Sequence, residues 1–164
     1  MFEINIPTTK NGLKELYVGT QVSLNGVIFT GRDAALPKLI KSIDNNQNKI
    51  SLKGSAIMHT AVSDAGISPT TSNKSEISES IPRLTKEGVL IHIGKGKLNE
   101  GVVDALNKFG GIFIVTPPVA ALLTSCVQSS EVIAFPEEGM EAIHRLVVHN
   151  LPGIVAVANG KSIY

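Results

Sequence analysis

Apolar and polar residues alternate at the start of the chain, where Phe2, Ile4 and Ile6 are separated by polar residues. A period of two is typical of a half-buried strand, and Pro7 ends it because proline cannot donate to a strand ladder. Later runs are short, apolar and rich in β-branched residues, which predicts further strands. These runs are 56–58, 89–93, 112–115, 132–135, 142–148 and 154–158.

Two more apolar segments, 21–24 and 27–30, flank Asn25 and Gly26. Asn-Gly between such segments is a strong hairpin signal, so we expect two short strands joined there. Elsewhere the apolar residues recur with helical spacing. The expected helices are 36–43 with Asp33 as its N-cap, 78–87, 98–109 and 119–123, and residues 13–16 allow one helical turn at most.

Strand, glycine-bearing turn, helix and strand follow one another through the middle of the chain, with mainly β segments at both ends. This order predicts an α/β fold with a mixed, partly parallel sheet and helices. The length of 164 residues is that of one domain, and no linker or repeat divides it, so a single domain over 1–164 is expected.

Composition narrows the function classes. Hydrophobic residues make up 43% of the chain but aromatic residues only 4%, which predicts an aliphatic core. The formal charge is +1 with no basic block, so no nucleic-acid partner is expected. No apolar run reaches the length of a membrane span, and Met1 leads directly into the first strand without a signal peptide. We therefore expect a cytoplasmic protein with no membrane partner.

The single cysteine, Cys126, excludes an internal disulfide framework and a multi-cysteine metal site within this chain. The four histidines lack metal-ligand spacing, and we interpret them as packed or surface residues. Glu137, Glu138 and Glu141 are candidate catalytic carboxylates, although acidic residues around a turn are more often solvated or capping. No Ser-His-Asp arrangement is evident.

Gly94, Lys95 and Gly96 follow a β-branched run and precede a helix, the position at which open α/β sheets place their ligands. The glycines allow close backbone approach, and amide groups at the coming helix start favour an anion. The segment is neither a Walker A motif nor a dinucleotide fingerprint. The alternative is an ordinary turn that carries a surface lysine.

The segment 66–74 is a second candidate. Pro69 predicts a shaped loop, its hydroxyl residues offer donors and acceptors, and Lys74 adds a positive charge. The hydroxyl residues are Ser68, Thr70, Thr71 and Ser72. Such a loop could hold an oxyanion, and the alternative is a solvated turn.

Arg32 is the third candidate, because it stands beside an expected helix N-terminus and arginine grips a carboxylate with two hydrogen bonds. Its alternative is a surface ion pair with Asp33 or Glu15. Three cation-bearing turns, at Arg32, Lys74 and Lys95, together predict a site for a small, doubly anionic molecule. They indicate no redox or metal chemistry of their own.

Four stretches stand in a characteristic order along the chain: Thr30-Gly31-Arg32-Asp33-Ala34-Ala35, Ser68-Pro69-Thr70-Thr71-Ser72, Ile93-Gly94-Lys95-Gly96 and Phe135-Pro136-Glu137-Glu138-Gly139-Met140-Glu141-Ala142-Ile143. Taken together they resemble the beta subunit of class I, iron–sulfur fumarate hydratase, or of its close relative L(+)-tartrate dehydratase. The resemblance covers the chain from about Gly19 to Tyr164.

The resemblance implies a swivelling β/β/α domain and reversible hydration of fumarate to L-malate. It also implies that this chain binds no cofactor itself. A separate cysteine-bearing alpha subunit, expected in an α2β2 heterotetramer, would carry a 4Fe–4S cluster whose open iron acts as a Lewis acid. The beta domain would hold the carboxylates of a small dicarboxylate substrate and handle the proton on carbon.

By motif, the resemblance assigns carboxylate binding to Arg32, Lys74 and Lys95, and proton abstraction to Thr70. The substrate-binding set it implies is Arg32, Thr70, Thr71, Lys74, Gly94, Lys95 and Gly96, with Thr70 and Lys95 as catalytic residues. The family loop reads Gly-Pro-Thr-Thr-x-x-Arg-Met, whereas this chain has Ser68, Lys74 and Ser75 at the variable places. Lysine supplies a point charge where arginine supplies a planar fork.

Three alternatives stay open at this point. One is the tartrate dehydratase beta subunit, and a second is a swivelling domain of another system, such as the small subunit of an isopropylmalate-type hydro-lyase or a phosphohistidine carrier. The carrier normally needs an exposed histidine in a glycine-rich setting, which none of the four histidines has. The third is a plain anion-binding module.

Overall fold

The computed structural model describes residues 1–71 and 73–164. Eight strands form one mixed sheet, and two short strands form a separate antiparallel pair. The large sheet contains β1 (Phe2–Ile6), β2 (Gln21–Thr30), β3 (Ser55–Met58), β6 (Val89–Gly94), β7 (Ile112–Val115), β8 (Val127–Ala134), β9 (Ile143–Ala158) and β10 (Lys161–Ser162). The pair is β4 (Val62–Ser63) with β5 (Gly66–Ile67). The predicted α/β fold with a partly parallel sheet is confirmed.

Parallel pairing runs through β1, β2, β3, β6 and β7 in that spatial order. The long strand β9 is antiparallel to β2 over most of its length and to β7 near its end. Because β9 pairs with both, the strands β2, β3, β6, β7 and β9 close into a ring. The strand β8 adds to the outer edge of β9.

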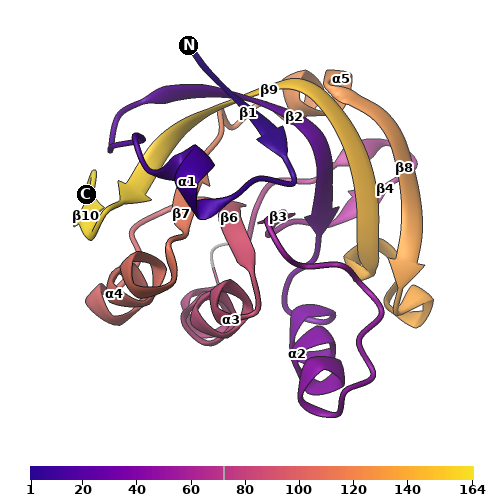
Figure 1. The fold of residues 1–164 in the computed structure, drawn as a ribbon. Coiled ribbons are helices and arrows are strands. Elements are labelled where there is room, and N and C mark those ends of the chain that lie inside the picture. Colours follow the sequence, from indigo (N-terminus) through magenta and orange to yellow (C-terminus); the bar gives the residue numbers. More distant parts are fainter. Residues whose placement is uncertain (72) are drawn as a thin grey trace.

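Five α-helices accompany the strands in the part of the chain that the structure describes. They are α1 (Lys10–Leu13), α2 (Leu36–Asp44), α3 (Lys74–Lys86), α4 (Glu100–Phe109) and α5 (Ala120–Ser125), with a 3-10 helix η1 (Pro136–Glu141). Figure 1 shows an arch of β1, β2 and β9 at the top, the strands β3, β6 and β7 below it, and α2, α3 and α4 at the bottom. This gives a β/β/α arrangement of layers.

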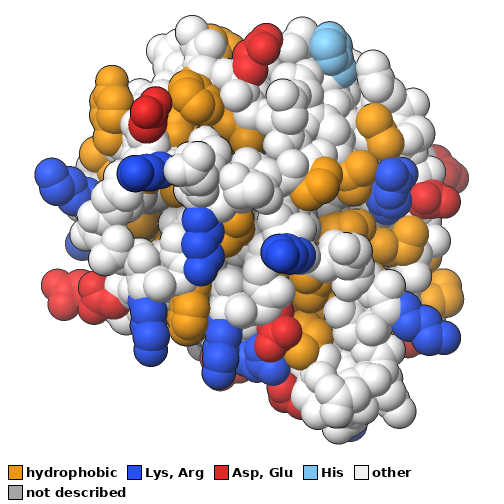
Figure 2. All heavy atoms as spheres, viewed as in Figure 1, with side chains coloured by type: hydrophobic (Ala, Val, Ile, Leu, Met, Phe, Trp, Pro, Cys, Tyr) orange, Lys and Arg blue, Asp and Glu red, His pale blue; other side chains and the backbone are white. Residues whose placement is uncertain are grey.

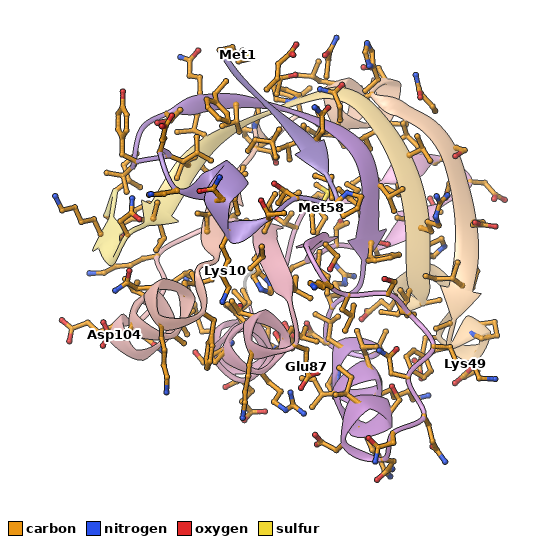
Figure 3. The ribbon with its side chains drawn as sticks, viewed as in Figure 1. Met1, Lys10, Lys49, Met58, Glu87 and Asp104 are labelled. Carbon is orange, nitrogen blue, oxygen red and sulfur yellow. The ribbon has the colours of Figure 1, made fainter. Side chains whose placement is uncertain are left out.

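The core is aliphatic, as the composition predicts, and it fills both spaces between the layers. One cluster, which includes Ile28, Met58 and Ile91, lies between the arch and the central strands. Two others place Leu36 of α2 and Ile81 of α3 against the opposite face. Burying one such side chain fully contributes about 1.5–3 kcal/mol. Met58 is labelled in the interior of the molecule in Figure 3.

The expected hairpin at Asn25 and Gly26 is wrong. The strand β2 continues through both residues with a shift of register against β9 at this point. Parallel pairing with β1 brings the carbonyl oxygen of Ile6 to 2.2 Å from where a Cβ of Gly26 would lie, at a φ of +113°. The glycine therefore serves close strand approach, and long-range pairing overrides the local turn signal.

The break predicted between 142–148 and 154–158 is also wrong, because β9 runs unbroken for 16 residues. Pro152 lies opposite Ser23 of β2 inside this strand. Asp33 does not cap α2 either: Ala35 occupies the N-cap position, and no side-chain hydrogen bond caps the helix. The Asp33 carboxylate instead reaches the loop after β5, as described below.

Helix α3 begins at Lys74, earlier than predicted, because Asn73 caps it by accepting a hydrogen bond from the Glu76 amide. Helix α4 ends at a left-handed Gly110, as the sequence predicts. Strand β8 starts earlier than the predicted 132–135. In the part of the chain that the structure describes, no helix is both long and apolar enough to traverse a lipid bilayer.

Candidate functional site

The candidate site lies where the parallel strands end. The strands β2, β3, β6 and β7 are parallel neighbours, so their carboxyl ends meet at one edge of the sheet. Arg32 follows β2, the loop 66–74 follows β3 through the β4–β5 pair, and Lys95 follows β6. Ligands of open α/β sheets bind outside this edge. The fold therefore brings the three predicted turns to the same side of the molecule.

Thr70 and Lys95 share a cavity of about 130 Å³. Its other walls come from Pro69 and from the segment after β7, which includes Thr116 and Val119. One side thus offers a hydroxyl and an ammonium group, and the other is apolar. This confirms the proximity of two predicted turns that are far apart in sequence, while their roles stay predictions.

Arg32 is held by the 3-10 helix η1. Its Nε lies 3.4 Å from Oε2 of Glu141, and the other carboxylate oxygen of Glu141 accepts a hydrogen bond of 3.1 Å from the Ala34 amide. Both side chains are about 28–29% exposed, so the pair is partly shielded from water. Since Glu141 engages Nε, the terminal nitrogens of Arg32 are the donors left for a carboxylate ligand.

The predicted alternatives for Arg32, an ion pair with Asp33 or Glu15, do not match this pairing with Glu141. Glu141 was among the candidate catalytic carboxylates, and the structure places it beside the arginine instead. Its companions Glu137 and Glu138 both contact Nζ of Lys38 on α2, at 3.1 and 2.6 Å. These contacts tie η1 to the start of α2.

Asp33 joins the turn after β2 to the loop 66–74. Its carboxylate accepts a hydrogen bond of 3.4 Å from the Thr71 hydroxyl and one of 2.7 Å from the side-chain amide of Asn73. The Thr71 hydroxyl in turn accepts from the Asn73 backbone amide at 3.2 Å. The loop is therefore fixed by side chains rather than loosely solvated. Ser72, one of the predicted hydroxyl residues, lies outside the described residues.

The start of the loop is anchored by the residues that follow β3. The Thr60 hydroxyl is completely buried and donates to the Ser68 carbonyl at 2.5 Å. The His59 carbonyl accepts from the Thr71 amide at 2.8 Å, and the His59 amide donates to Ile93 of β6 at 2.9 Å. His59 thus connects the Thr71 loop to the strand that leads to Lys95.

Lys74 takes a different direction from the other two cations. Its Nζ donates a hydrogen bond to the Lys97 carbonyl at 2.7 Å. The same Nζ lies beside Gly96, at 2.8 Å from the position that a Cβ of this glycine would take. Lys74 lines a separate hollow between α3 and α4, with Ile77 and Val102, and is not among the residues around the Thr70 cavity. Its role in carboxylate binding stays a prediction.

The two glycines of the Lys95 turn have different surroundings. Gly94 ends β6 with its Cα beside the Phe113 ring, where a Cβ would lie 3.0 Å from the ring. Gly96 has a φ of +84°, which few residues with side chains adopt, and its turn is therefore suited to glycine. Both keep the backbone around Lys95 close to the sheet edge.

A buried polar chain beneath the loop escaped sequence analysis. His59 Nε2 lies 3.0 Å from Nδ1 of His92, and Nε2 of His92 lies 2.9 Å from the Thr85 hydroxyl. The other nitrogen of His59 faces Oε2 of Glu76 at 4.0 Å. The sequence interpretation of packed histidines is confirmed for His59, His92 and His144, and His149 is exposed.

Burial sets the protonation of this chain. It lowers the pKa of His59 to about 4, and the negative charge of Asp33 opposes this effect. Burial and the neighbouring His59 hold the pKa of His92 well below its ordinary value. Burial raises the pKa of Glu76 to about 7. At neutral pH both rings are uncharged, and Glu76 is divided between acid and carboxylate.

The described residues contain no group of three or more histidine, cysteine or acidic side chains placed to hold a metal ion. The one cysteine, Cys126, contacts the carbonyl oxygens of Leu122 and Asn150. One thiol does not provide the ligand set of an iron–sulfur cluster, which is normally built from several cysteine thiolates. This chain by itself does not fit such a cofactor.

The positively charged groups on the face seen in Figure 2 are spread out rather than gathered in one patch. The cations that matter at the sheet edge are the ones that the loops fix in place. Against this geometry, comparison with known proteins is decisive: the sequence model of the fumarase C-terminus matches residues 1–164. The chain belongs to the fumarase C-terminus family.

Individual relatives agree with this assignment. The putative L(+)-tartrate dehydratase subunit beta of Methanocaldococcus jannaschii is 34% identical over 172 residues, which cover 95% of this chain and 87% of that protein. The aerobic class I fumarate hydratase of Escherichia coli (strain K12) is 31% identical over 156 residues, or 88% of this chain. Fumarate hydratase 2 of Leishmania major is 28% identical over 170 residues, or 97% of this chain and 30% of that protein.

The chain spans only 28% of the length of the Escherichia coli fumarate hydratase, whereas it spans most of the tartrate dehydratase subunit. It therefore corresponds to one part of the long fumarate hydratases. The family assignment made from the sequence motifs is confirmed.

Proposed function

We propose that this chain is the beta-type part of a hydro-lyase that reversibly hydrates fumarate to L-malate. The observation that carries the proposal is the convergence of Arg32, Thr70 and Lys95 at one sheet edge, in a chain of the fumarase C-terminus family. A cation oriented by Glu141 and a second cation beside a hydroxyl suit a small dicarboxylate, because each carboxylate can face one positive charge.

Each residue of the site has a distinct part in this proposal. Arg32, oriented by Glu141, binds one carboxylate through its terminal nitrogens. Lys95, in its glycine-flanked turn, binds the other. Thr70 stands beside Lys95 and handles the proton on the carbon next to the carboxylate. A neighbouring ammonium group favours the alkoxide form of the threonine, which on its own is a poor base.

The hydroxyl group of malate also needs an electrophile in order to leave. In the proposal a separate alpha subunit with three cysteines carries a 4Fe–4S cluster that supplies this Lewis acid, within an α2β2 heterotetramer. This chain closes over the substrate from the other side and supplies the carboxylate-binding and proton-handling groups. Its activity then depends on the partner.

The test is anaerobic co-expression with the candidate alpha subunit, followed by assays on malate, fumarate and tartrate. We expect no turnover by this chain alone and turnover of fumarate and malate by the complex. Lys95→Ala should lower the activity of the assembled complex, while Lys49→Ala, in the exposed loop at the far end of α2, should leave it unchanged. Fumarate hydration by the isolated chain would contradict the proposal.

A second substrate has specific support. The relative that matches over nearly its whole length is named as a tartrate dehydratase beta subunit. L(+)-tartrate differs from malate by one more hydroxyl group, which the same two carboxylate anchors would accept. Competition between tartrate and malate in the assembled complex separates the two, because the true substrate has the higher kcat/KM.

A further inference from the structure

The buried polar chain has a direction that its hydrogen bonds determine. The Thr85 hydroxyl donates its only proton to the Ile81 carbonyl at 2.6 Å, so it accepts from Nε2 of His92. His92 is neutral, and its Nδ1 therefore accepts from Nε2 of His59. His59 is neutral as well, which leaves a lone pair on its Nδ1, pointing toward Glu76.

Among the described residues, this end of the chain has no hydrogen-bond partner. Nδ1 of His59 and both carboxyl oxygens of Glu76 are buried and unpaired, and so is the Ser80 hydroxyl one turn further along α3. The side chains of His59 and Glu76 are 1% and 7% exposed. Unpaired buried polar atoms are costly, so a partner for the lone pair is strongly favoured.

A neutral Glu76 is the group that can satisfy this lone pair. As an acid it carries a proton to donate, and its Oε2 is the carboxyl oxygen that faces Nδ1, at 4.0 Å, so a side-chain movement that shortens this separation would form the hydrogen bond. As a carboxylate it would place a second acceptor against an acceptor. The hydrogen-bond chain is complete only in the acid form.

The same chain controls the loop of the candidate site. The His59 backbone holds the Thr71 amide on one side and Ile93 of β6 on the other. Glu76 is also joined to the loop through its backbone, since its amide donates to Asn73, which in turn donates to Asp33. A shift of the Glu76–His59 contact is therefore transmitted to both the Thr70–Thr71 and the Lys95 sides.

We propose that Glu76 is a positioning residue, which as a neutral acid donates to Nδ1 of His59 and so holds the Thr70–Thr71 loop in place for a dicarboxylate. Ionisation of Glu76 removes the proton that it donates to His59, and the loop is then less firmly positioned. The proposal rests on the proposed hydro-lyase function for its effect on substrate, but the coupling of Glu76 to the loop is a property of this chain alone.

The surroundings of Glu76 determine the pH range over which it ionises. Burial raises its pKa to about 7, the nearby Ser80 hydroxyl opposes this, and three anions add to it. These are Asp33 from the turn after β2, Glu79 on the same helix and Glu141 from η1. A bound dicarboxylate adds negative charge at the same edge and thus favours the acid form further. Substrate binding and the neutral carboxyl group support each other.

The remaining elements packed on α3 bring little opposing charge. From β3 and β6 the facing groups are the neutral rings of His59 and His92. Helix α4 meets α3 through Asn99, whose amide donates to Ser78. The cation Arg83 lies two turns along α3 from Glu76 and pairs with Asp44 of α2.

The first experiment uses this chain alone. Hydrogen exchange of the Thr71 amide is measured by NMR from about pH 6 to about pH 8, corrected for the intrinsic exchange rate. We expect wild-type protection to fall about tenfold, because only about a tenth of a carboxyl remains neutral one pH unit above its pKa. In Glu76→Gln, whose side-chain amide can donate a hydrogen bond but cannot ionise, the protection of the Thr71 amide should stay constant over this pH range. The control Glu3→Gln, at an exposed position on β1 whose charge does not act on Glu76, should follow the wild type.

Constant protection in the wild type overturns the proposal, and so does a parallel fall in Glu76→Gln. The wild-type profile decides the matter even if the Gln variant does not fold. The second experiment measures pH profiles of the assembled complex. KM for fumarate should rise about fivefold from about pH 7 to about pH 8, because the neutral fraction of Glu76 falls from about a half to about a tenth, with a smaller change in kcat. Glu76→Gln should abolish the rise. A KM that does not change with pH in the active wild-type complex counts against the proposal.

The two experiments can refute the proposed function and the positioning role of Glu76 independently of each other. A complex that turns over neither fumarate nor tartrate refutes the proposed function, while the exchange profile of Thr71 still decides whether Glu76 positions the loop. An active complex whose Thr71 exchange is independent of Glu76 refutes the positioning role alone.

Discussion

Replacing Glu76 by glutamine should stabilise the fold increasingly as the pH rises. The folded protein binds the Glu76 proton more tightly than the unfolded chain, because burial raises the pKa from 4.5 to about 7. Below 4.5 the carboxyl is neutral in both states and costs nothing. Between 4.5 and 7 the unfolded chain releases the proton first, so wild-type stability is lost progressively, and above 7 the full cost of a buried charge remains.

The magnitude follows from the same change. A pKa moved from 4.5 to about 7 corresponds to about 3 kcal/mol, at about 1.4 kcal/mol for each pKa unit. Polar neighbours and the effective dielectric of protein interiors reduce this, and we expect about 2 kcal/mol. The lowered pKa values of His59 and His92 act with the opposite sign, since their effect destabilises the protein as the pH falls below 6.5. That effect is common to both proteins and cancels in their difference.

The assay is urea unfolding followed by far-ultraviolet circular dichroism, at about pH 5 and about pH 8, on the wild type, Glu76→Gln and Glu3→Gln. The free energy of unfolding of Glu76→Gln, relative to the wild type, should increase by about 2 kcal/mol between the two pH values. Glu3 is exposed and its charge does not act on Glu76, so its variant should show no such increase. A difference that stays flat, or that grows as the pH falls, would refute the assignment of a raised pKa to Glu76.

Four further outcomes test other parts of the structure. Gly26→Ala should lower the free energy of unfolding by about 2 kcal/mol or more in urea titrations, because its Cβ would lie 2.2 Å from the Ile6 carbonyl oxygen at a positive φ. Phe113→Ala, which empties a fully buried site, should cost about 3–5 kcal/mol in the same assay. Lys38→Met removes only partly exposed ion pairs to η1 and should leave the free energy of unfolding close to that of the wild type. Arg32→Lys should raise KM of the assembled complex about tenfold or more, because lysine lacks the paired donors, and an unchanged KM would argue against carboxylate binding there.

The turns that carry Arg32 and Lys95 were predictable because their signals are local. A β-branched run followed by a glycine-bearing turn and a helix indicates the carboxyl end of a parallel strand, wherever that strand lies in the sheet. Parallel pairing then places such ends together. The same local signals correctly placed the left-handed end of α4 at Gly110.

The partners of these residues could not be predicted, because they come from distant parts of the chain. Glu141 is 109 residues from Arg32 in the sequence, and only the pairing of β9 with β2 brings η1 beside the turn after β2. Asp33 has the local pattern of a helix cap, yet the loop 66–74 supplies it with better donors. Glu76 precedes the predicted helix 78–87 in the sequence, and nothing in its sequence neighbourhood indicates that it lies beside two buried histidines.

The unbroken strand β9 has a consequence for how such a site can change over evolutionary time. Its 16 residues begin two positions after Glu141 and pair with β2 and β7, so the carboxylate that orients Arg32 directly precedes an extensively paired strand of the fold. Thr70 and Lys95 instead lie outside the helices and strands, in turns that a few side-chain and backbone contacts hold. We expect mutations in those two turns to cost less stability than mutations in β9, while the arginine anchor stays where the framework sets it.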